Sequence, residues 1–146
     1  MNYPNYLFYS NLTSTEFFFE SIGSKGGINK VVAFRQTSVT SIYNLGLADY
    51  DPNTGEIDDT IITDNGDMEK ILATIFQIVI YYLSTNPEHI IYFSGNTSSR
   101  TRLYRIAINH SLSEITSLFD VLGLINSQLE PFTANKAYEA FLIRKK

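Results

Sequence analysis

The sequence has no cysteine, no tryptophan and only two histidines in 146 residues. Without cysteine the chain has no disulfide bond, no thiolate nucleophile and no cysteine-ligated zinc site. His89 and His110 do not stand in a metal-binding spacing, so we expect no metal site and no cofactor. The G-x-S-x-G, H-E-x-x-H and dinucleotide-binding patterns are also missing, which disfavours hydrolases of familiar types.

Basic residues are scarce, because 11 Lys and Arg stand against 15 Asp and Glu and give a net charge of −4. Net charge therefore does not support nucleic acid as a partner, which would need a local basic patch. A long hydrophobic run is also absent. Residues 67–83 are interrupted by Thr74 and Gln77 and fall short of the roughly 20 apolar residues that span a membrane. The first five residues do not resemble a signal peptide, and we expect a cytoplasmic protein with no membrane partner.

The chain nevertheless contains enough apolar material for a core, with 44% hydrophobic residues that include ten Tyr and ten Phe. We expect one domain over residues 1–146. Residues 67–83 predict a helix that is apolar around most of its circumference, so other elements must cover it on most sides. Asp64 or Asn65 is the expected N-cap, and Asn86 and Pro87 end the helix.

The N-terminal third predicts a β-meander, because strand-like runs are joined by short turns such as the one at Gly26 and Gly27. The expected strands are residues 6–9, 16–22, 28–36, 39–47, 56–62, 89–93 and 138–143, and residues 144–146 form a solvated tail. Further helices are expected at 100–109 and after the capping box of Ser111 and Glu114, whereas 119–124 fits a strand or a helix end. The predicted fold class is α+β, an antiparallel β-meander sheet packed against a long central helix, with one or two further short helices.

The segment at residues 90–108 predicts an anion site. A strand is followed by a small polar loop and by a helix that carries Arg100, Arg102 and Arg105 in its first two turns. Free N–H groups at a helix start favour an anion, and guanidinium groups bind phosphate through two parallel hydrogen bonds. The predicted ligand-binding residues of this segment are Thr97, Ser98, Ser99, Arg100, Arg102, Tyr104 and Arg105.

A structural interpretation of the same residues remains open. Thr97 or Ser98 then only caps the helix, and the arginines pair with carboxylates such as Asp49, Asp58 or Asp59. Three arginines at a helix start oppose the helix dipole, so some anion should compensate them in either case.

Asn44 and Asp67 complete the candidate site. Asn44 interrupts a strand-like run, where an amide is a poor strand former. It either satisfies a buried backbone group or faces a pocket together with Asp67 and the arginines.

Four stretches of the chain also carry a resemblance: residues 43–45 with Asp49, residues 65–67, residues 95–105 and residues 140–144. In these stretches the chain resembles an uncharacterised family of small bacterial proteins, found chiefly in Bacteroidota and classed as a domain of unknown function. Ala48 stands where the family is expected to carry glycine. The resemblance implies a single-domain bacterial protein, and it brings no known activity or catalytic residue.

These observations favour a small cytoplasmic binding protein with a phosphate or anion site at a helix N-terminus, whose ligand is a nucleotide or nucleic acid. One alternative is an enzyme, a nuclease-like or nucleotide-modifying toxin component, that uses Arg100, Arg102, Tyr104 and Asp67 around a phosphate. The other is a protein–protein interaction module, a homodimer included, that uses its aromatic N-terminal strands.

Overall fold

The computed structural model describes residues 4–58, 64–95, 98–110 and 112–146, without the side chains at 98–100, 103, 107 and 110. The chain divides into two compact units. Unit 1 contains residues 1–35 and 45–82, and unit 2 contains residues 36–44 and 83–146. Strand β4 (Ile42–Tyr50) and helix α1 (Met68–Thr85) contribute residues to both units. The expectation of a single domain stays a prediction.

The elements confirm the predicted α+β class. The other strands are β1 (Tyr9–Ser10), β2 (Glu16–Gly23), β3 (Gly26–Gln36), β5 (Ile57–Asp58), β6 (Ile90–Phe93), β7 (Phe119–Ile125), β8 (Gln128–Pro131) and β9 (Ala140–Lys145). The other helices are α2 (Ser98–His110) and α3 (Leu112–Leu118). Over the described residues the strand order is β1-β2-β3-β4-β6-β9-β7-β8, and β5 pairs with β4. No helix in this part of the chain is long and apolar enough to cross a membrane.

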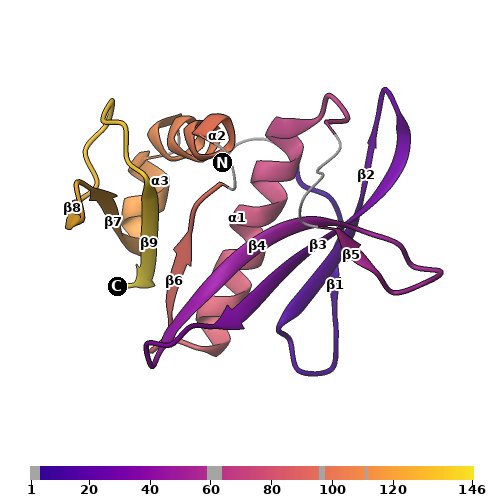
Figure 1. Cartoon of the computed structure of the whole chain (residues 1–146), viewed down its shortest axis with the longest axis horizontal. Coiled ribbons are helices and arrows are strands. Elements are labelled where there is room, and N and C mark those ends of the chain that lie inside the picture. The colour runs from indigo at the N-terminus through magenta and orange to yellow at the C-terminus, as the bar shows by residue number, and fades with distance from the viewer. Residues whose placement is uncertain (1–3, 59–63, 96–97, 111) are drawn as a thin grey trace. The chain divides into compact units, whose positions relative to one another are not determined.

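In unit 1, aromatic side chains of the β2–β3 hairpin pack against α1, whose ribbon Figure 1 shows. The two strands pair antiparallel as predicted, and the turn between them is Ser24 and Lys25, with Gly26 and Gly27 already in β3. Alternation along β2 buries Phe17 and Phe19, and the ring of Phe17 lies 5.7 Å from that of Tyr81 on α1. Phe34 of β3 stacks on Tyr82 of the same helix. Each such buried side chain contributes about 1.5–3 kcal/mol to folding, so this face holds unit 1 together.

In unit 2, strands β6, β9, β7 and β8 pair antiparallel, whereas residues 42–44 of β4 pair with β6 in parallel. This parallel pair differs from the expected all-antiparallel meander. Its cause is the chain order, because α1 lies between β4 and β6 and a helical crossover joins parallel strands. The core of unit 2 includes Phe93 of β6 and Phe141 of β9, whose rings stack with centroids 5.3 Å apart.

Some predicted boundaries were wrong. The strand predicted at 39–47 is β4 at 42–50, because residues 37–41 form a loop that the N–H and hydroxyl of Thr37 close on the carbonyl of Ile42. The strand predicted at 6–9 overlaps β1 only at Tyr9, because β1 is Tyr9–Ser10. The edge strand predicted at 56–62 is β5, and residues 59–63 lie outside the described part of the chain.

The C-terminal third holds the largest differences. Strand β8 was not predicted, because the turn before it consists of Asn126 and Ser127, which take positive φ without any glycine. The ambiguous stretch at 119–124 is strand β7. Arg144 and Lys145 belong to β9 rather than to a solvated tail, since Arg144 pairs in register with Asp120 of β7.

Candidate functional site

The segment before α1 forms the N-terminal cap of that helix. The carbonyl of Asp67 accepts a hydrogen bond from the N–H of Ile71 at 3.0 Å, so Asp67 is the N-cap. The expectation of Asp64 or Asn65 was therefore wrong. Asp64 instead accepts a hydrogen bond from the N–H of Gly66, whose φ of +78° suits glycine. The two residues turn the chain into the helix.

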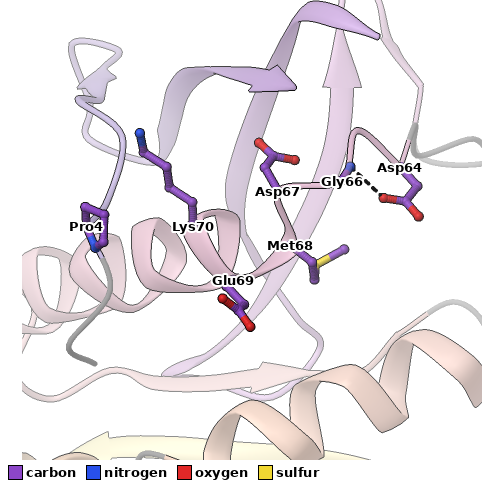
Figure 2. Close-up of a pocket in the computed structure, with 7 residues that line it drawn as sticks. All are labelled: Pro4, Asp64, Gly66, Asp67, Met68, Glu69 and Lys70. Atoms are coloured by element: carbon purple, nitrogen blue, oxygen red, sulfur yellow. Dashed lines mark hydrogen bonds between the residues drawn. The ribbon is translucent and has the colours of Figure 1, made fainter. Parts of the chain in front are cut away.

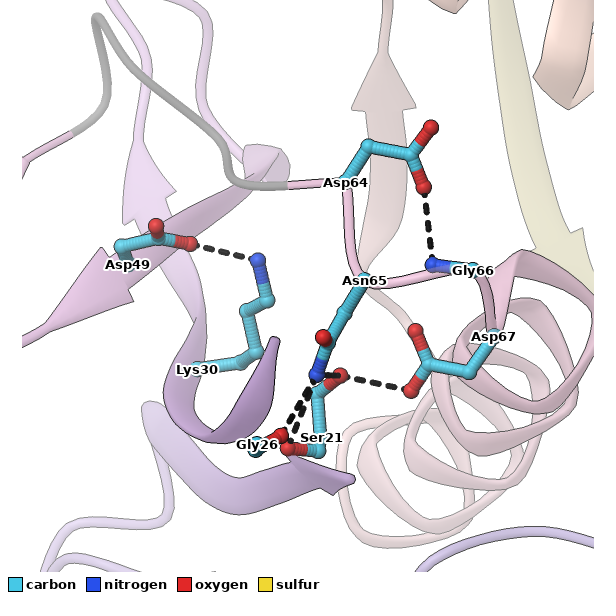
Figure 3. A network of polar contacts seen from close by, with 8 residues as sticks. All are labelled: Ser21, Gly26, Lys30, Asp49, Asp64, Asn65, Gly66 and Asp67. Atoms are coloured by element: carbon cyan, nitrogen blue, oxygen red, sulfur yellow. Dashed lines mark hydrogen bonds and ion pairs between the residues drawn. The ribbon is translucent and has the colours of Figure 1, made fainter. Parts of the chain in front are cut away.

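Asn65 joins this segment to the β2–β3 hairpin (Figure 3). Its side chain is buried, its Oδ1 accepts a hydrogen bond from the N–H of Lys25 at 2.6 Å, and its Nδ2 donates to the carbonyl of Gly26 at 2.8 Å. A Cβ at Gly23 would overlap the Asn65 carbonyl oxygen. Asn65 thus acts as a structural connector that requires glycine at position 23.

The side chain of Asp67 is held by two short hydrogen bonds. Its Oδ2 accepts from the hydroxyl of Tyr6 at 2.5 Å and from the hydroxyl of Ser21 at 2.6 Å. The hydroxyl of Tyr6 in turn accepts from the N–H of Ile22 at 3.0 Å. Burial and the hydrogen bond to Asp67 raise the pKa of Tyr6 above its ordinary value. The other oxygen of Asp67, Oδ1, is buried and has no hydrogen-bond partner.

Tyr6 also fastens the N-terminal segment to α1. Its N–H donates to the hydroxyl of Thr74 at 2.9 Å, and the ammonium of Lys70 lies 4.3 Å from the centre of its ring. Tyr6 and Asp67 therefore belong to one polar network that crosses the first two turns of α1.

A second polar contact joins β3 to β4 (Figure 3). The ammonium of Lys30 on β3 lies 2.5 Å from Oδ1 of Asp49 on β4, and the Lys30 side chain is completely buried. Charges so deeply buried are tolerated when they are paired. Asp49 is thus placed against Lys30 in unit 1.

The start of α1 also borders a cavity of about 580 Å³ (Figure 2). Its lining residues are Pro4, Asp64, Gly66, Asp67, Met68, Glu69 and Lys70. The size is typical of small-molecule sites. Three carboxylates against one ammonium disfavour an anionic ligand, and acidic side chains at this end of a helix complement its dipole. The cavity is therefore a poor phosphate site.

The arginines of the predicted anion site lie on α2, in unit 2. Arg102 is exposed and Arg105 is half-buried, and neither forms an ion pair or hydrogen bond with another described residue. Thr97 and the side chains of Ser98, Ser99 and Arg100 lie outside the described part of the chain. The helix sequence contains no acidic residue, so the described guanidinium groups have no carboxylate from their own helix.

Two neighbouring residues of α2, Tyr104 and Thr101, have contacts of their own. Tyr104 is buried, with its ring edge-on to Phe93 at 5.3 Å, so it serves the core of unit 2. The hydroxyl of Thr101 accepts from the N–H of Gly95 at 2.9 Å and closes the loop before the helix. Asn109 has a buried Oδ1 without a hydrogen-bond partner.

Asn44 is exposed on β4, where its Cα pairs with that of Tyr92. Its side chain forms no hydrogen bond with a described residue, and the interpretation that it satisfies a buried backbone group gains no support. Asn44 and the arginines belong to unit 2, whereas Asp67 belongs to unit 1. A pocket that joins them stays a prediction.

Sequence reasoning missed Tyr6, Ser21 and Lys30. Their partners are distant in sequence, as Tyr6 and Asp67 are 61 residues apart. One signal was available for Lys30, because alternation along β3 places it on the same face as Val32 and Phe34. A lysine in that series predicts a buried charge that needs a carboxylate.

Comparisons with known proteins place the chain in a family. No curated protein and no solved structure matches it. The expected resemblance to a family of unknown function is confirmed, while the bacterial range of that family stays a prediction. Residues 2–146 match the model of the family of unknown function DUF6934, and the chain belongs to that family.

Proposed function

We propose that the protein binds a small phosphate-bearing ligand through the face of α2 that carries Arg102 and Arg105. The observation that supports this most is that these two side chains have no ion-pair partner among the described residues. They stand three residues apart on one helix face. Among the described carboxylates, Asp49 and Asp58 included, none pairs with Arg102 or Arg105, which supports the proposal over the structural alternative.

The chemistry of these groups favours phosphate. A guanidinium presents parallel N–H donors that match two oxygens of a phosphate, and such charge-assisted hydrogen bonds are stronger than neutral ones. The net charge of −4 works against a long nucleic-acid strand, which gains affinity from many phosphate contacts. A nucleotide needs only one cluster of cationic groups. We therefore favour a nucleotide over nucleic acid.

Titration calorimetry at low ionic strength tests the proposal, with pyrophosphate, a nucleoside monophosphate and a short single-stranded oligonucleotide as probes. The test variant is Arg102→Ala with Arg105→Ala. The matched control is Arg35→Ala with Arg144→Ala, which removes the same charge from exposed positions on β3 and β9. We expect the test variant to lose about tenfold or more in affinity, which corresponds to about 1.4 kcal/mol. The control should bind like the wild type.

Two results would contradict the proposal. Equal weakening in both double variants would show a general charge effect rather than a site. A fall in melting temperature in the test variant that matches its loss of binding would show that the arginines are structural. Stronger binding of the oligonucleotide than of the monophosphate would shift the ligand to nucleic acid.

The alternative of an interaction module also has an observation in its favour. Leu7, Tyr9, Leu12 and Ile22 are exposed in unit 1, with Leu7 exposed by 94% and Tyr9 by 65%. Large exposed apolar patches mark protein–protein contacts, and these side chains are the candidates for such a patch. Sedimentation equilibrium of the wild type against Leu7→Ser with Leu12→Ser tests this, with the exposed Val39→Ser as control. A wild type that stays monomeric at every concentration contradicts a homodimer.

A further inference from the structure

The arginine face of α2 continues beyond the two guanidinium groups. Arg102, Arg105 and Asn109 follow the spacing i, i+3, i+7, which places them on one side of the helix. Ile106 lies next to them and is 46% exposed. At 1.5 Å per residue the distance along the axis from position 102 to position 109 is about 10 Å. The face thus has a cationic part, an apolar part and an amide, in that order.

Asn109 is the unusual member of this face. Its Oδ1 is buried without a hydrogen-bond partner, although a buried polar atom in a folded protein nearly always has one. Arg105, which stands one helical turn before it on the same face, does not donate to it. Asn109 as a whole is half-buried, and the χ2 torsion of asparagine is soft, so its amide can reorient at the surface of the helix. An amide whose oxygen has no partner, next to an exposed apolar side chain, is suited to a planar, hydrogen-bonding group.

We infer that the ligand of this face is a nucleotide whose base carries an amino group, as adenine does. The inference rests on the proposed phosphate site. The phosphate lies at Arg102 and Arg105, the ring packs on Ile106, and the Asn109 amide pairs with the base. An asparagine amide accepts from the amino group of adenine and donates to the adjacent ring nitrogen, so it recognises that base through two hydrogen bonds. Inorganic phosphate and phosphorylated sugars use only the cationic part.

The experiment compares four probes by titration calorimetry: adenosine 5′-monophosphate, inosine 5′-monophosphate, ribose 5-phosphate and inorganic phosphate. Inosine carries a carbonyl oxygen in place of the amino group, so the asparagine amide oxygen loses its hydrogen-bond donor on the base. We expect the wild type to prefer the adenosine over the inosine nucleotide by about tenfold. Asn109→Ala should abolish this preference and leave ribose 5-phosphate binding unchanged. Ile106→Ala should weaken both nucleotides equally and leave ribose 5-phosphate unchanged.

The outcomes separate this inference from the proposal on which it rests. An adenosine preference that survives in Asn109→Ala overturns the role of the amide, as does a wild type that binds adenosine 5′-monophosphate no better than ribose 5-phosphate. In both cases the phosphate site stands. Unchanged binding of every probe by Arg102→Ala with Arg105→Ala, or no binding to the wild type, removes the phosphate site and this inference with it. A merely structural Asn109 predicts a lower melting temperature in Asn109→Ala with the preference intact.

Discussion

The hydroxyl of Tyr6 should stabilise the protein through its contact with Asp67, and Tyr6→Phe removes this hydroxyl together with its contacts to Asp67 and to the backbone of Ile22. The ring remains, so its stack on Phe19 and its contact with Lys70 persist. The lost hydrogen bond is 2.5 Å long and ends on a carboxylate, a class that contributes about 1.5–3 kcal/mol. The N–H of Ile22 also loses its acceptor, but Ile22 is 63% exposed and water can replace it. We expect a loss of about 2 kcal/mol, or roughly 4–8 °C in melting temperature.

The pH dependence gives a second, sharper test of the same contact. The folded protein raises the pKa of Tyr6 above its ordinary value of 10.0, so the folded state keeps the proton when the unfolded state loses it. The contribution is therefore complete below pH 10 and is lost as pH rises through the folded pKa. Urea unfolding of wild type and Tyr6→Phe should show a constant difference between pH 7 and 9 and a smaller one at pH 11. A difference below about 0.5 kcal/mol at pH 7, or one that grows with pH, would refute the reasoning.

The remaining predictions concern the segment before α1 and the β2 residues that contact it, with Gly46 on β4 as a control. Urea unfolding at neutral pH measures each of them. Ser21→Ala should lower the free energy of unfolding. The double variant with Tyr6→Phe should lose at least about 0.5 kcal/mol more than the sum of the two single losses, because Asp67 then loses both donors. Additive losses contradict this. Gly66→Ala should cost about 1 kcal/mol because of its positive φ. Gly46→Ala, which meets no atom within 4 Å, should be close to neutral. Gly23→Ala should cost about 1–3 kcal/mol, because its Cβ overlaps the Asn65 carbonyl. A variant as stable as the wild type would show that the β2–β3 hairpin and the segment before α1 separate freely.

Local patterns predicted the elements that local forces determine. Helix α1 ends at Thr85, two residues after the predicted end, because Pro87 cannot continue a helix and the apolar periodicity is long. The β2–β3 hairpin followed from its glycines. The parallel pairing of β4 with β6 could not be predicted, because contacts between residues far apart in the sequence determine which strands pair. Strand β8 was not predicted because its turn consists of Asn126 and Ser127, whereas glycine is the usual sequence signal for such a turn.

The same division applies to the candidate site. Arg102 and Arg105 could be selected because they lie close in sequence on one predicted helix. The environment of Asp67 could not be predicted, since its donors Tyr6 and Ser21 come from elements 61 and 46 residues away. Sequence reasoning therefore selects residues that share one helix face and misses those that only the folded chain brings together.

Amide chemical-shift mapping of the ¹⁵N-labelled protein with adenosine 5′-monophosphate tests the central proposal most directly. Binding at the arginine face predicts that the largest shifts fall on residues 98–110 of α2 and that Arg102→Ala with Arg105→Ala abolishes them. Shifts centred on residues 64–70 would place the ligand in the cavity at the start of α1, and the absence of any shift would remove the proposed nucleotide. Either result would contradict a phosphate site on α2.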